Sequence, residues 1–224
     1  MNDGELTGQA QTHIAAVADP ACLLHAHVVA PFLNLRRAAW AEGIDLAPVS
    51  SFRDFARQLG IWNGKFSGER PMQDASGAPL DAATLTPRER IDAILLWSAL
   101  PGASRHHWGT DLDLVDRKAG GAGYQIKLTP GEFAPGGPFE KLDRWLTVHA
   151  PRFGFFRPFQ GVRSGVQPEP WHFSFAPIAE KARQRLTPQV LRTAIAGAPL
   201  LGKDVVLEHL EELHSRYVAA IDLP

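Results

Sequence analysis

The stretch SRHHWGTDLD, residues 104–113, decides how the rest of this 224-residue chain is interpreted. Leu112 and Leu114 alternate with polar residues, which indicates a strand, and Gly109 permits a tight turn just before it. The segment that carries the two histidines and the strand that follows Gly109 can therefore face each other. Because imidazole and carboxylate groups both bind zinc, the stretch is either a polar turn or half of a metal site.

Four side chains in this stretch could bind a metal ion: His106, His107, Asp111 and Asp113. Adjacent residues of an extended segment point to opposite sides, so His106 and His107 are not expected to share one ion. A turn at Gly109 can bring His106 and Asp113 together, although either residue alone would suit a surface turn or a strand cap. A catalytic zinc needs three protein ligands and an open position for water, so a third ligand must come from elsewhere.

Residues 168–173, PEPWHF, supply the missing groups. His172 lies in a short aromatic strand and is the candidate third ligand, while Trp171 is expected to pack and fix that strand. Glu169 lies three residues before His172. A carboxylate beside a metal can act as general base, because the pKa of metal-bound water falls to about 7.

The rest of the chain mixes helical and extended patterns without strict alternation. Apolar spacing predicts helices over 27–42 and 53–62 and helices that begin near 87, 138, 188 and 203. Short apolar or alternating runs predict strands at 46–49, 112–114, 154–156 and 171–175. Residues 124–128 are expected to pair with the strand at 112–114, and residues 63–86 to form a long surface loop. We predict an α+β fold, a small antiparallel sheet flanked by helices with a helical C-terminal extension.

The composition is that of a globular enzyme, with 45 % hydrophobic and 21 % charged residues. The 23 basic and 24 acidic residues give a net charge of -1, which favours neither nucleic acid nor an anionic membrane as partner. The single Cys22 excludes an internal disulfide and a thiolate-rich zinc site. No run approaches the ~20 apolar residues of a membrane span. The N-terminus lacks a signal-peptide pattern, so we expect a cytoplasmic protein as written, or a periplasmic or envelope protein if a leader is removed.

The two motifs together resemble the signature of the zinc peptidases grouped with lysostaphin, the D-Ala-D-Ala metallopeptidases and the hedgehog amino-terminal domain. The matching residues are Ser104, His106, Gly109, Asp113, Glu169, Trp171 and His172. The chain looks most similar to the D-alanyl-D-alanine carboxypeptidase branch associated with vancomycin resistance. The segment VSSFRDFARQ, residues 49–58, is similar to a Ser-x-x-Arg…Gln element of that branch. The resemblance covers residues 27–177.

The resemblance implies Zn²⁺ held by His106, Asp113 and His172, with Glu169 as general base and then general acid. It implies hydrolysis of peptidoglycan stem peptides or muropeptides by means of a metal-bound water. The expected reaction is that of a D-alanyl-D-alanine or L,D-carboxypeptidase. A His₂Asp site suits zinc, although other divalent ions also occupy such sites.

The resemblance also implies roles for three residues around the metal. Arg53 is expected to steady the oxyanion or a substrate carbonyl, because a guanidinium stays charged and presents several donors. Ser104 and Gln58 are expected to help hold the peptide's terminal carboxylate or backbone. Asp111 departs from the many relatives with a small residue there, and is expected either to support His106 or to point into solvent.

Two alternatives stay open on the same scaffold. One is a peptidoglycan endopeptidase, which needs a cleft open at both ends, and the loop at 63–86 would decide that. The other is a non-catalytic zinc-binding module, which needs neither Glu169 nor Arg53. The predicted organisation is an N-terminal segment over 1–26, a zinc peptidase domain over 27–180 and a helical extension over 181–224 packed on the same domain. The oligomeric state is left open.

Overall fold

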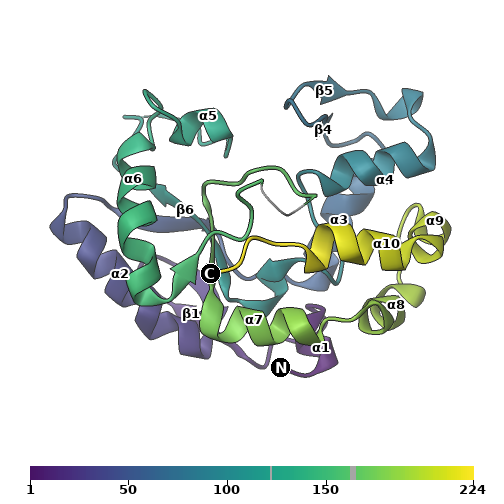
Figure 1. Ribbon diagram of the computed structural model, residues 1–224, viewed down its shortest axis with the longest axis horizontal. Coiled ribbons are helices and arrows are strands. Elements are labelled where there is room, and N and C mark those ends of the chain that lie inside the picture. The colour runs from purple at the N-terminus through teal and green to yellow at the C-terminus, as the bar shows by residue number, and fades with distance from the viewer. Residues whose placement is uncertain (122, 162–164) are drawn as a thin grey trace.

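A four-stranded antiparallel sheet flanked by helices organises the computed structural model, which describes residues 1–121, 123–161 and 165–224 (Figure 1). The strand order is β3-β6-β8-β7. The bounds are β3 Leu46–Ser50, β6 Asp111–Asp116, β7 Phe155–Phe156 and β8 His172–Phe175. The predicted α+β class and the four predicted strands are confirmed.

Strand β6 is bonded along both of its edges, to β3 on one side and to β8 on the other. The prediction that residues 124–128 pair with this strand is therefore wrong, because no free edge is left for them. In the β6–β8 pair, Asp113 lies opposite His172 and Asp111 lies opposite Ser174. This register places the two motifs of the sequence side by side.

One face of the sheet packs against two helices to form an apolar core, here called the sheet core. These helices are α2 Val29–Ala41 and α6 Glu140–His149, and both lie on the same side of the molecule in Figure 1. The sheet core includes Phe32, Leu35, Leu112, Leu114, Leu142 and Leu146, all buried. The apolar spacing of the sequence predicted both helices. Phe32 and Leu35 in α2 are three residues apart, and Leu142 and Leu146 in α6 are four residues apart, as one face of a helix requires.

A second apolar cluster, the helical core, joins the middle of the chain to its C-terminal part. It includes Trp62, Ile91, Leu191 and Leu210, all fully buried. Its helices are α3 Phe55–Phe66, α4 Pro87–Leu95, α7 Ala176–Arg185, α8 Pro188–Ala196, α9 Lys203–Glu208 and α10 Leu210–His214. Helix α4 begins with the predicted capping box, in which the Thr86 side chain and Glu89 each accept from the other's backbone N–H.

Several short elements were not predicted from the sequence. The first 26 residues contain α1 Asp3–Leu6 and a hairpin of β1 Ile14–Val17 with β2 Cys22–His25. Part of the predicted loop at 63–86 is ordered, since α3 continues to Phe66 and a second hairpin follows. That hairpin pairs β4 Met72–Gln73 with β5 Pro79–Leu80. The remaining short helix, α5, spans Pro130–Phe133. Within the described residues, no helix combines the length and the apolar character that a bilayer crossing demands.

Gly109 makes the turn that leads into β6. Its φ is +65°, a left-handed backbone conformation that residues other than glycine rarely adopt. Its carbonyl accepts a hydrogen bond from the His25 backbone N–H at 2.8 Å. A Cβ at this position would lie 2.5 Å from both His25 N and Ile14 Cδ1, so the N-terminal hairpin leaves no room for a side chain.

Gly109→Ala is expected to lower the free energy of unfolding by about 2–5 kcal/mol, the sum of the left-handed penalty and of overpacking. Gly77→Ala is the matched control, because Gly77 has a φ of +84° but nothing within 4 Å of the place that a methyl group would take. That variant should lose only about 1–2 kcal/mol. Urea denaturation measures both, and equal losses would show that the contact with the hairpin is unimportant.

Candidate active site

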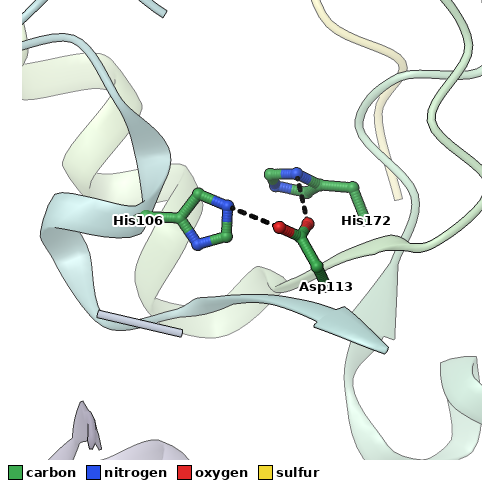
Figure 2. A group of neighbouring side chains, drawn as sticks. All are labelled: His106, Asp113 and His172. Carbon is green, nitrogen blue, oxygen red and sulfur yellow. Dashed lines mark ion pairs between the residues drawn. The ribbon is translucent and has the colours of Figure 1, made fainter. Parts of the chain in front are cut away.

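Three predicted metal ligands converge in one buried cluster (Figure 2). His106 comes from the 3-10 helix Arg105–Trp108, Asp113 from β6 and His172 from β8. One ligand atom of each lies within 4.8 Å of the others. The separations are 3.4 Å from His106 Nε2 to Asp113 Oδ2 and 3.3 Å from His172 Nδ1 to Asp113 Oδ1.

The donor set fits a zinc ion. Two imidazole nitrogens and one carboxylate turn toward a common point, and zinc accepts both groups at about 2 Å. Asp113 Oδ1 is buried, and its contact with His172 Nδ1 at 3.3 Å lacks the geometry of a hydrogen bond, which leaves this oxygen able to bind a cation. All three side chains are at least 90 % shielded from solvent.

Glu169 lies directly beside this cluster. Its Oε2 is 3.1 Å from His172 Nδ1, the ring nitrogen that faces Asp113. The backbone fixes this position from two directions, because Glu169 N–H donates to Phe159 O and His172 N–H donates to Glu169 O. A carboxylate is therefore held at the edge of the candidate metal position, within reach of a molecule that binds there.

Asp111 is fully buried and contacts His172, so both expectations for it, support of His106 and exposure to solvent, are wrong. Its Oδ1 is 2.9 Å from His172 Nε2, the ring nitrogen that points away from Asp113. Arg105 Nε donates to Asp111 Oδ1 at 2.8 Å. Thr110 Oγ1 and Ser174 Oγ donate to Asp111 Oδ2 at 2.5 and 3.0 Å. The carboxylate thus accepts from four neighbours and orients the imidazole.

The cluster has the electrostatics of a cation site. Burial would raise the pKa of Asp113, but His106 and His172 hold it well below its usual range. Burial would likewise raise the pKa of Asp111, which Arg105 and His172 lower instead. For His172, burial favours the neutral ring, yet the adjacent carboxylates of Asp111, Asp113 and Glu169 raise its pKa well above the usual value. Both carboxylates are therefore ionised at neutral pH, and they favour positive charge between them.

A cavity of about 280 Å³ opens onto the cluster, and Arg53 and Ser104 line it together with Glu169. Arg53 Nη2 donates to Ser104 Oγ at 3.1 Å, and Arg53 N–H donates to His106 O. Arg53 Nε is buried and has no acceptor among the described residues. Burial lowers the pKa of Arg53, while Asp113 opposes this effect.

Gln58 lies behind the cavity wall instead of in it. Its side chain is fully buried, and its Nε2 donates to Ala99 O at 2.6 Å. Ala99 itself lines the cavity, whereas Gln58 does not. The geometry therefore favours an indirect role for Gln58, in which it holds the wall that a substrate would touch.

His107 has a structural role that the sequence did not reveal. It lies on a 3-10 helix, not on an extended segment, and is separated from the metal ligands for that reason. Gly102 N–H donates to its Nε2, so its Nδ1 carries the proton and donates to Arg53 O at 2.6 Å. Burial lowers its pKa to about 3, which keeps the ring neutral. His107 ties the Arg53 backbone to the turn that carries His106.

A family model for D-alanyl-D-alanine carboxypeptidases, VanY, matches residues 21–178, which is most of the chain. The chain belongs to the VanY family. This confirms the resemblance predicted from the two motifs, and it extends the match to β2. An uncharacterised protein of Haemophilus influenzae is 40 % identical over 121 residues, which cover 53 % of this chain and 92 % of that protein.

Solved structures of the VanY family share the fold. One is VanYB in complex with D-alanine-D-alanine, with a TM-score of 0.55 and 20 % identity, covering 88 % of this chain and 90 % of that one. Another is a vancomycin-resistance D,D-pentapeptidase VanY variant in complex with Zn(II), with a TM-score of 0.53 and 21 % identity, covering 88 % and 91 %. Family membership supports a peptidoglycan peptidase, and thus a hydrolase.

Asp111→Asn is expected to weaken zinc binding by about 10-fold, because a neutral amide orients the His172 ring less firmly and withdraws negative charge from it. Competition with a chromophoric chelator measures this affinity. Asp45→Asn is the matched control, since Asp45 is also buried and accepts from Arg36 and Arg117 but does not touch the cluster. Equal zinc affinities in the two variants would contradict a role for Asp111 in orienting His172.

Proposed function

We propose that this protein is a zinc-dependent carboxypeptidase that removes the terminal D-alanine from peptidoglycan stem peptides. The convergence of His106, Asp113 and His172, with Glu169 3.1 Å from His172 Nδ1, carries the proposal. Membership of the VanY family and the Zn(II) complex of a structural relative support it. Two imidazoles and one carboxylate leave an open position, as catalytic zinc sites do.

When bound, zinc would supply a Lewis acid for the scissile carbonyl and activate a water molecule for attack. The chain's own residues supply the rest. Glu169 accepts the proton of the attacking water at a carboxylate oxygen and then delivers it to the leaving amine, so one residue serves as base and acid. Arg53, with its unpartnered Nε, donates to the carbonyl oxygen as negative charge develops there.

Two further residues are proposed to orient the substrate. Ser104 lines the cavity and accepts from Arg53, and its hydroxyl has no acceptor among the described residues, so it can donate to a peptide group. Gln58 acts through the wall at Ala99, to which it donates. A non-catalytic zinc module has no use for Arg53 or for Glu169 at the cavity, and both observations favour an enzyme.

Glu169→Gln should retain zinc at one equivalent but lose hydrolysis by about 10²–10⁴-fold, because the amide cannot accept a proton. Mass spectrometry of products from defined muropeptides gives the rate, and elemental analysis gives the zinc content. Hydrolysis at the wild-type rate would remove Glu169 from the mechanism.

His106→Ala should lose most bound zinc and, with it, activity, since only two ligands would be left. The metal content of the purified variant checks this directly. His149→Ala is a suitable control, because His149 stacks on Trp145 outside the cluster. If both variants bind zinc equally well, His106 is not a ligand.

A further inference from the structure

Lys65 is a second cation in the catalytic cavity, and neither motif of the sequence includes it. It lies in the last turn of α3 and lines the same cavity as Arg53 and Glu169. In the described part of the chain, its ammonium group makes neither a hydrogen bond nor an ion pair. Burial lowers the pKa of Lys65, and Glu169 is close enough to oppose this effect.

The other charged groups around the cavity are compensated. Arg105 pairs with Asp111 at 2.8 Å, and Asp113 lies between two histidines. The Arg53 guanidinium, by contrast, donates only to the neutral Ser104 hydroxyl among the described residues, and no described carboxylate lies within ion-pair distance of it. Arg53 and Lys65 therefore both line the cavity without an ion-pair partner among the described residues.

The charges around the cavity indicate that its ligand is negatively charged. Asp113 and Glu169 together balance a divalent ion at the cluster, which leaves the charges of Arg53 and Lys65 unbalanced. A half-buried cation without an ion-pair partner has lost part of its hydration, so a ligand that brings one negative charge to this pair is favoured. A neutral ligand leaves that cost uncompensated.

We propose that Lys65, together with Arg53, receives the free α-carboxylate of the last residue of the peptide and so restricts the site to exopeptidase action. This inference rests on the proposed function and deepens it. A lysine suits this role because its ammonium group is a mobile point charge with three donors. In an endopeptidase substrate the chain continues, and a neutral amide stands where the carboxylate would be. The same cavity has apolar walls at Leu100, Ala103 and Val218, which suit a small apolar side chain such as that of alanine.

A matched pair of substrates tests the proposal: an N-acylated Lys-D-Ala-D-Ala tripeptide as the free acid and as the C-terminal amide. The wild-type zinc enzyme should hydrolyse the acid with a kcat/KM at least 10-fold above that of the amide. Lys65→Met should lower kcat/KM for the acid by about 10–100-fold, mainly through KM, because a charge-assisted hydrogen bond is lost. It should leave kcat/KM for the amide almost unchanged, so that the preference for the acid is lost.

Control variants separate this effect from a loss of structure. Lys65→Arg keeps the charge and should retain most of the preference for the acid, and Lys65→Gln should behave like Lys65→Met. Lys181→Met on α7, whose side chain is exposed and outside the cavity, should match the wild type. Zinc content and circular dichroism should be the same for all four variants.

A second test does not require hydrolysis: calorimetry measures how tightly the acid and the amide bind to proteins that carry Glu169→Gln. The acid should bind more tightly than the amide, and Lys65→Met should abolish the difference. If Lys65→Met keeps the wild-type preference for the acid in both arms, the proposal is overturned while the peptidase function stands. If the wild type hydrolyses neither peptide, the proposed function fails, and the binding arm still decides the role of Lys65.

Discussion

The pairing of β6 with β8 is the constraint on which the rest of this structure depends. It places Asp113 opposite His172, although the two residues are far apart in the chain. Since side chains alternate between the faces of a sheet, a slip of one residue would turn either ligand away from the other. The hydrogen bond from Leu114 N–H to Trp171 O extends the pairing beyond the strand and helps to fix the register.

The same alternation gives the sheet two different faces. Asp111 and Asp113 project from one face of β6, and Leu112 and Leu114 project from the other face into the sheet core. In β8, His172 and Ser174 share the polar face with Asp111. A buried layer of charged groups is tolerated here because most of its members have hydrogen-bond partners. Asp111, for example, accepts from both Arg105 and Thr110. These contacts fix the orientation of the Asp111 and His172 side chains.

Much of the fold and the central part of the site could be predicted from the sequence. Periodicity gave the main helices and all four strands of the sheet, and the two motifs gave the ligand set that converges. Residues 124–128 were misassigned because an apolar alternating run does not reveal whether a strand edge is free. The environment of Asp111 depends on the β6–β8 register, and local spacing cannot supply that. Lys65 was missed because its meaning depends on which groups surround it after folding, and a lysine near a helix end is ordinarily a solvated charge.

Two of the candidate metal ligands and part of the cavity wall are attached to different hydrophobic cores. Two of the three candidate ligands, Asp113 and His172, sit on strands backed by the sheet core, whereas Leu95, Leu100 and Ala103 line the cavity from the helical core. Substitutions at these three positions can therefore reshape the cavity without touching the strands that carry Asp113 and His172. Such a division lets the ligand selectivity of the cavity diverge between relatives while the candidate metal-binding residues on the strands are conserved.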